Sequence, residues 1–130
     1  MPRKVYNAGA AAAVGPYSHA VEANGLVHLS GQTPLDPASG KLVEGDVGVQ
    51  TAQCLNNLFA VLAEAGLDSD DVVSCSVYLT DMNDFRAMNA VYQDLFSQPY
   101  PARTTIGVAA LPLGARVEIG LIAARRADRR

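Results

Sequence analysis

Apolar and polar residues alternate in short runs near both ends of the chain and recur at helical spacing in the middle. The alternation is clearest in segment 72–80, where one side carries Val73, Cys75, Val77 and Leu79. A period of two predicts a half-buried strand. The shorter runs 18–23 and 26–30 flank Asn24-Gly25, a dipeptide that accepts positive φ at both central positions of a type I′ turn. We therefore expect a β-hairpin at this position.

Two segments have the apolar spacing of amphipathic helices. The first begins after Asp46, a candidate N-cap, and ends before Gly66, and its apolar positions are Val47, Cys54, Leu55, Leu58 and Leu62. The second is capped by Thr80 or Asp81, and its apolar face consists of Phe85, Met88, Tyr92, Leu95 and Phe96. The prolines of "SQPYP" end it, and "GQTPLDPASGKLVEG" is expected to be a loop with turns.

The runs 102–109 and 115–124 flank "ALPLG" and are expected to form a second hairpin-like pair of strands. Matching their apolar faces in antiparallel pairing brings Arg103, Thr105, Glu118 and Gly120 together on the opposite face. Arg103 and Glu118 would then be neighbours, either as a structural ion pair or as part of a site. The space left by Thr105 and nearby glycines favours a site, because a guanidinium facing a gap suits a carboxylate ligand.

Two helices with five or six strands, connected mostly as hairpins, predict an α+β sandwich in which the helices cover one face of a mostly antiparallel sheet. No repeat or linker divides the 130 residues, so residues 1–130 are expected to form one domain. Segment 121–130 is expected to include a basic, frayed C-terminal tail. The uncovered face of the sheet is only partly polar, so we expect another subunit to cover it.

Composition and charge narrow the class of protein. With 49% hydrophobic and 18% charged residues, the chain fits neither a disordered protein nor a membrane span. A run of four alanines near the start is a poor signal-peptide core, and Cys54 and Cys75 lie in apolar runs, so we expect a cytoplasmic protein without disulfides. The net charge of −3 disfavours nucleic-acid binding. His19 and His28 lack neighbours at metal-ligand spacing, so no metal site is expected.

Six segments carry a family resemblance: "GPYSHA", "LSGQTPLDPASG", "QTAQCLNNLFAVLAEAGL", "VVSCSVYLTDMNDFRAMNAVY", "PARTT" and "VEIGLIA". In this order, from Gly15 to Ala124, they resemble the reactive intermediate deaminase family, also called RidA or YjgF-like proteins. The resemblance implies a chorismate-mutase-like sandwich assembled as a homotrimer, with pockets at the subunit interfaces. It also implies a cofactor-free 2-iminobutanoate/2-iminopropanoate deaminase, which repairs metabolite damage by hydrolysing 2-aminoacrylate or 2-iminopropionate to a 2-oxo acid and ammonia.

The resemblance also assigns candidate site residues. Arg103 would bind the substrate carboxylate, Glu118 would position the attacking water, and Tyr17 would be a third catalytic residue. The implied substrate-binding residues are Ser30, Gly31, Asn89 and Thr105. Thr105 stands where relatives often have cysteine, but its backbone N–H can still donate to the carboxylate. Gly120 replaces the second glutamate of the "EIE" found in many members.

Two other functions compete with the deaminase. A non-catalytic binding protein would use the same Arg103 pocket to hold a small 2-oxo acid, but it would have no need of Glu118. A ribonuclease, an activity attributed to some relatives, would need a basic groove that this acidic chain does not indicate. The expected partners are therefore small 2-imino and 2-oxo acids and further copies of the chain, with no nucleic acid and no membrane.

Overall fold

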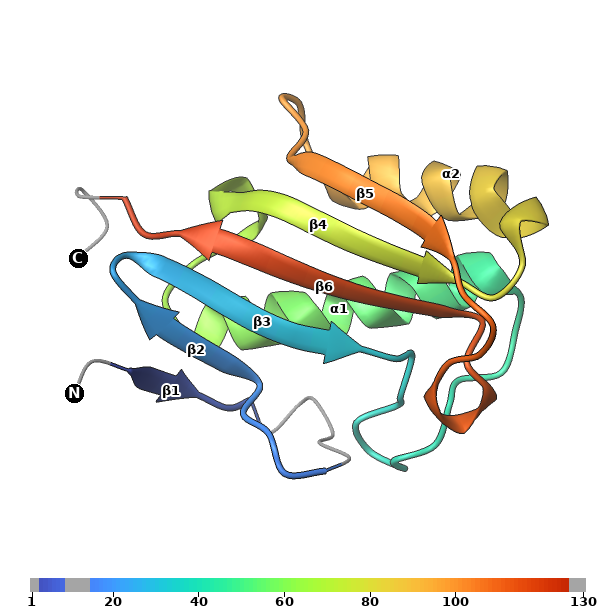
Figure 1. The fold of residues 1–130 in the computed structure, drawn as a ribbon, viewed down its shortest axis with the longest axis horizontal. Coiled ribbons are helices and arrows are strands. Elements are labelled where there is room, and N and C mark those ends of the chain that lie inside the picture. The colour runs from blue at the N-terminus through green and yellow to red at the C-terminus, as the bar shows by residue number, and fades with distance from the viewer. Residues whose placement is uncertain (1–2, 9–14, 127–130) are drawn as a thin grey trace.

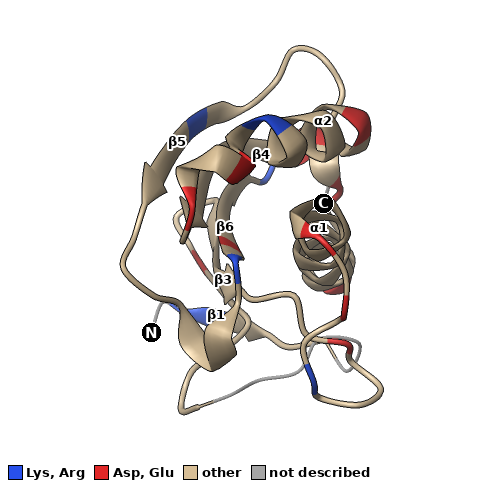
Figure 2. Cartoon of the chain, turned by 90° about the vertical axis from the view of Figure 1, so that its right-hand side faces the viewer, with Lys and Arg blue, Asp and Glu red and all other residues tan. Residues whose placement is uncertain are grey.

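The computed structural model describes residues 3–8 and 15–126, and within them the chain folds as an α+β sandwich with one mixed sheet in the order β1-β2-β3-β6-β4-β5 (Figure 1). The strands are β1 (Lys4–Tyr6), β2 (Ala20–Ala23), β3 (Leu26–Gln32), β4 (Val72–Leu79), β5 (Ala102–Gly107) and β6 (Val117–Ala124). The helices are α1 (Val47–Glu64) and α2 (Phe85–Leu95), with short 3-10 turns η1 (Ser69–Asp71), η2 (Met82–Asp84) and η3 (Pro112–Gly114). Figure 2 shows both α-helices on the same side of the sheet.

The local signals for the first hairpin and for α1 are confirmed. Asn24 and Gly25 have φ of 55° and 78° and connect β2 to β3. The Asp46 carboxylate accepts a hydrogen bond from the Val49 N–H at 3.0 Å, which satisfies one free donor of the first turn of α1. Gly66, with φ of 75°, follows the last turn. None of the helices in the described part of the chain is long and apolar enough to span a membrane.

Side chains of β4, β6 and α1 form the centre of the core. The fully buried members include Val77, Leu79, Val117, Ile119, Leu55, Leu58 and Leu62. Burying each of them stabilises the fold by about 1.5–3 kcal/mol. Val73 was expected among them but is exposed, because the register between β4 and β6 shifts between Val72 and Ser74 and Val72 takes the inward position.

The expected hairpin between β5 and β6 is wrong, because β4 lies between these two strands. β6 pairs antiparallel with β4, whereas β5 pairs parallel with β4. The physical reason is the intervening helix: α2 connects β4 to β5, and a strand that follows a crossover helix runs parallel to the strand before it. The expected apolar face of β5 is also wrong, since Ile106 is 46% exposed.

Arg125 joins four segments of the chain at one end of the sheet. Its guanidinium donates to both carboxylate oxygens of Glu22 at 2.8 and 2.9 Å and to the Ala65 carbonyl at 2.8 Å, and it also contacts the Tyr6 hydroxyl. Arg126 forms an ion pair with Asp71 at 3.0 Å. The prediction of a frayed tail is therefore wrong for Arg125 and Arg126, because both contact the rest of the domain. Residues 127–130 lie outside the described residues.

The ion pair between Glu22 and Arg125 makes the stability of the fold depend on pH. The hydrogen bond from Arg125 is the main cause that lowers the pKa of Glu22 to about 2, below its ordinary value of 4.5. A depressed pKa stabilises the fold above pH 4.5, and this contribution is lost as the pH falls from 4.5 towards 2.

We expect Glu22→Gln to lower the free energy of unfolding at pH 7 by about 2 kcal/mol, with a difference from wild type that shrinks towards pH 2. Urea unfolding at several pH values measures it. Glu64→Gln changes the net charge equally at an exposed position and serves as the control. An equal effect of both substitutions would contradict this role of the ion pair.

Candidate active site

Arg103 and Glu118, expected to be neighbours, lie on opposite faces of the sheet. Along β4, Arg103 is opposite Cys75 and Glu118 is opposite Tyr78. Directly opposed residues project to the same side, and Cys75 faces the helices whereas Tyr78 faces away from them. The predicted site residues other than Thr105 are divided between two pockets, named here the Glu118 pocket and the Arg103 pocket.

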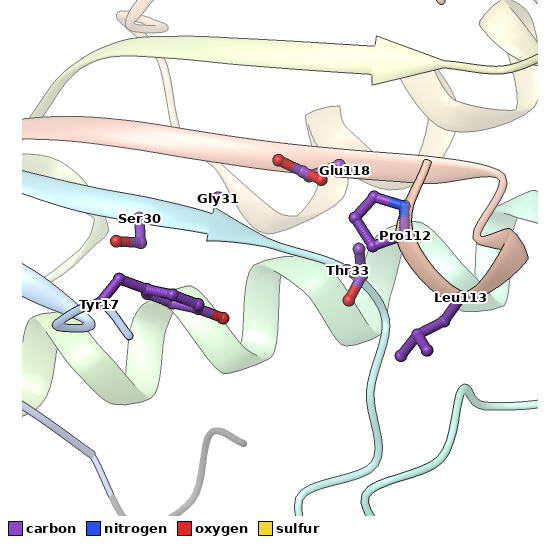
Figure 3. A pocket seen from close by; sticks show the side chains of 7 residues that line it. All are labelled: Tyr17, Ser30, Gly31, Thr33, Pro112, Leu113 and Glu118. Carbon is purple, nitrogen blue, oxygen red and sulfur yellow. The ribbon is translucent and has the colours of Figure 1, made fainter. Parts of the chain in front are cut away.

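The Glu118 pocket is a cavity of about 300 Å³ on the uncovered face, lined by Tyr17, Ser30, Gly31, Thr33, Pro112, Leu113 and Glu118 (Figure 3). Its residues come from the segment before β2, from the end of β3 with the residue that follows it, and from η3 and the start of β6. Four of the seven were predicted site residues. Thr33, Pro112 and Leu113 were missed, because the loop that contains Thr33 and the segment "ALPLG" carried no signal except that of connections between elements.

Ser30 holds the segment that carries Tyr17. The Ser30 hydroxyl donates to the Ser18 carbonyl at 2.6 Å, and the Ser30 N–H donates to the His19 carbonyl at 2.9 Å. The His19 N–H in turn donates to the Asn7 side-chain oxygen at 3.0 Å. These contacts fix the backbone next to Tyr17, so the structure gives Ser30 a positioning role in addition to its place in the pocket wall.

A β-bulge brings Gly31 against the carboxylate of Glu118. Leu29 pairs with Leu121 and Gln32 pairs with Ile119, so β3 has one residue more than β6 at this point. A Cβ added to Gly31 would overlap an oxygen of Glu118 and would lie 3.1 Å from its Cδ. Only glycine leaves room for the carboxylate in its present place.

Burial raises the pKa of Glu118 above its ordinary value. No hydrogen bond or ion pair joins this carboxylate to another described residue, so it is available to a ligand or a water molecule. A carboxylate with a raised pKa is a better proton acceptor than one in water. The Glu118 pocket can therefore hold a water molecule next to a base.

We expect Gly31→Ala to slow any hydrolysis that uses Glu118 as a base about 10–100-fold, because the new methyl group would displace the Glu118 carboxylate. Steady-state rates measure this effect, with circular dichroism to check the fold. Gly120→Ala is the matched control, since its Cβ would meet the Gly31 Cα at an ordinary 3.7 Å. Equal losses in both variants would show that the close approach at Gly31 has no special role.

The Arg103 pocket is a cavity of about 260 Å³ between α2 and the start of β5, lined by Asn89, Tyr92, Gln93, Tyr100, Pro101 and Arg103. The guanidinium lies 4.7 Å from the centre of the Tyr92 ring and 5.6 Å from that of Phe85. These rings hold the cation without neutralising it. Arg103 forms no ion pair with any described residue, so its charge is free to bind an anion.

Thr105 and Cys75 lie on the same face of the sheet as Arg103. The Thr105 hydroxyl is buried and has no hydrogen-bond partner among the described residues. Burial raises the pKa of the Cys75 thiol to about 11, which keeps it protonated and makes it a poor nucleophile. The described residues contain no group of three or more side chains able to hold a metal ion.

The fold and the two pockets define an α+β protein with separate cationic and acidic pockets on opposite faces of one sheet. The family model described as Endoribonuclease L-PSP matches residues 8–125. Protein DfrA of Myxococcus xanthus is 48% identical over 126 residues, which cover 95% of this chain and 96% of DfrA. The 2-iminobutanoate/2-iminopropanoate deaminase of Capra hircus is 48% identical over 121 residues, which cover 93% of this chain and 88% of the goat protein. The chain therefore belongs to the RidA/YjgF family.

Solved structures show the same fold. Escherichia coli TdcF, solved with bound serine, superimposes with a TM-score of 0.90 at 36% identity and covers 95% of this chain and 99% of TdcF. Such a close match over almost the whole chain supports the architecture derived above from strand order and burial.

Proposed function

We propose that the protein hydrolyses 2-imino acids, with their enamine tautomers, to 2-oxo acids and ammonia, as a 2-iminobutanoate/2-iminopropanoate deaminase. The observation that carries the proposal is that Arg103 and Glu118 both lack an ion pair with any described residue. Each is free for a ligand, in a family with members named for this reaction. Serine, the ligand of TdcF, also combines a carboxylate with a nitrogen on the adjacent carbon.

The two pockets would act together when copies of the chain assemble. Within one chain Arg103 and Glu118 face opposite sides of the sheet, so a single ligand cannot reach both. The face of the sheet that the helices leave uncovered (Figure 2), where Ile106 is exposed next to Tyr78, is free to meet another copy. We propose a homotrimer in which the Arg103 pocket of one copy meets the Glu118 pocket of its neighbour.

In such a composite site, the Arg103 guanidinium would hold the substrate carboxylate through two parallel hydrogen bonds. The backbone N–H of Thr105 is placed on the same strand to assist. Glu118 would take a proton from water as the water attacks the imine carbon. Tyr17 and Leu113 would close the pocket on the side of the water.

The direct test generates 2-iminopropionate from alanine with an amino-acid oxidase and follows pyruvate formation. We expect pyruvate to form faster in proportion to the amount of protein added. If pyruvate forms no faster with the protein than without it, but pyruvate binds to the protein, the protein is a binding protein for 2-oxo acids and the deaminase proposal fails.

A further inference from the structure

Leu113 is a large apolar residue at a position that suits leucine poorly. It lies in η3 with φ of 61° and ψ of 16°, and it is 58% exposed. This left-handed conformation is unfavourable for most residues, because the Cβ approaches the following carbonyl oxygen, whereas glycine and asparagine tolerate it. An exposed leucine also gains little from the hydrophobic effect. Neither the local backbone nor burial in the core therefore accounts for a leucine at this position.

The Leu113 side chain lines the Glu118 pocket. It forms an apolar part of the wall together with Pro112 and Tyr17, while Glu118 supplies a carboxylate. Figure 3 shows that the Leu113 side chain extends from η3 towards the side of the pocket on which Tyr17 lies. Residues that depart from local conformational preferences are expected at functional sites. The side chain thus offers an apolar surface to a ligand in this pocket.

The proposed reaction determines which part of a substrate reaches this surface. With the carboxylate bound to Arg103 of one copy and C2 next to the water held by Glu118 of its neighbour, the side chain on C2 lies in the rest of the Glu118 pocket. This cavity of about 300 Å³ has the volume of about ten molecules of liquid water. One attacking water and the methyl group of 2-iminopropionate leave most of it empty. Space therefore remains for a longer side chain.

We propose that Leu113 is a specificity-determining residue whose side chain contacts the aliphatic side chain of the substrate, so that the pocket prefers 2-imino acids with longer or branched aliphatic side chains over 2-iminopropionate. This inference rests on the proposed function and names the substrate class within it. The physical basis is the removal of two apolar surfaces from water, one on Leu113 and one on the substrate. A substrate that has only a methyl group gains little from this contact.

The test compares the binding of pyruvate and 4-methyl-2-oxopentanoate, which share the carboxylate and the carbonyl group and differ only in the side chain. Leu113→Asn keeps nearly the same shape, makes the surface polar and suits the left-handed backbone. By isothermal titration calorimetry, wild type should bind the longer acid severalfold more tightly than pyruvate. The variant should bind the longer acid about tenfold more weakly than wild type and change pyruvate binding by no more than about twofold.

Kinetics provide a second readout of the same preference. An amino-acid oxidase generates the corresponding imines from leucine and from alanine. The ratio of the two kcat/KM values should fall about tenfold in Leu113→Asn, because only the longer imine loses its contact. Thermal unfolding of the variant should begin no earlier than that of wild type, because the substitution relieves an unfavourable backbone conformation.

Leu26→Asn is the matched control. Leu26 is 40% exposed, alternates with the buried Val27 and therefore lies on the same uncovered face of the sheet, but it lines neither pocket. Leu113→Gly, which also suits the left-handed backbone, should show the same selective loss if Leu113→Asn does not fold. Sedimentation velocity checks that all variants assemble as wild type does.

Equal weakening of both acids in the Leu113 variants, or the same selective loss in Leu26→Asn, would overturn the inference and indicate a role of Leu113 in assembly. A wild type that binds pyruvate as tightly as the longer acid would also overturn it. Because binding needs no turnover, the preference is measurable even if wild type hydrolyses no imine. Hydrolysis of both imines without a shift in their ratio would refute the role of Leu113 and leave the proposed function in place.

Discussion

Glu118→Gln is expected to slow 2-iminopropionate hydrolysis about 10²–10⁴-fold, the usual contribution of a positioned general base. Glutamine has nearly the same size, so it keeps the packing against Gly31, but its amide cannot take a proton from water. The wild-type rate should also fall at acidic pH as Glu118 becomes protonated, at a pH above the ordinary pKa of glutamate, because burial raises the pKa of this group. Initial rates of pyruvate formation between pH 4 and 8 measure both effects.

Glu64→Gln serves as the control for Glu118→Gln, since it removes one negative charge at an exposed position outside both pockets. Thermal unfolding should show that both variants remain folded. A Glu118→Gln variant that retains more than a tenth of the wild-type rate would rule out Glu118 as the base.

Arg103→Met is expected to lower kcat/KM at least about 100-fold, because the carboxylate loses a charge-assisted bidentate partner. Methionine can still pack against the rings of Phe85 and Tyr92, so the fold should persist. Arg103→Lys keeps the charge without the planar fork and should be intermediate. Full activity in Arg103→Met would show that the substrate carboxylate is bound elsewhere.

Mixing the two inactive variants tests whether copies share a site. If Arg103 comes from one copy and Glu118 from its neighbour, an equal mixture of Arg103→Met and Glu118→Gln chains, unfolded and refolded together, regains about one quarter of the wild-type rate, because one site in four receives both intact residues. If both residues act from one chain, the mixture stays as inactive as its components. Variants refolded separately and then combined provide the control.

The local elements could be predicted from sequence because their signals are local. Asn24 with Gly25 determines a turn, Asp46 determines the start of a helix, and alternation in β4 determines which side is buried. β1 was missed because three residues give too short a pattern. The pairing of β5 was wrong because strand neighbours depend on where α2 packs, which no pattern within β5 records.

The sequence analysis named residues that line both pockets, but it did not predict how these residues are arranged. Glu118 and Arg103 stand out as charges in apolar strands, and the roles proposed for them rest on the family resemblance. Their placement on opposite faces follows from the register of β5 and of β6 against β4. A shift of one residue in either of these two strands would bring the two side chains to the same face. The close approach of Gly31 to Glu118 depends on a bulge, which the sequence does not reveal.

All the residues that line the Arg103 pocket lie in one continuous stretch, from Asn89 to Arg103. The Glu118 pocket, in contrast, combines three separate parts of the chain. A chimaera that receives residues 85–107 from a relative would therefore inherit the whole anion pocket with its supporting helix, while keeping its own Glu118 pocket. Under the proposed function, the residues that bind the substrate carboxylate could be transferred to a relative as one continuous segment, whereas the residues of the Glu118 pocket could not.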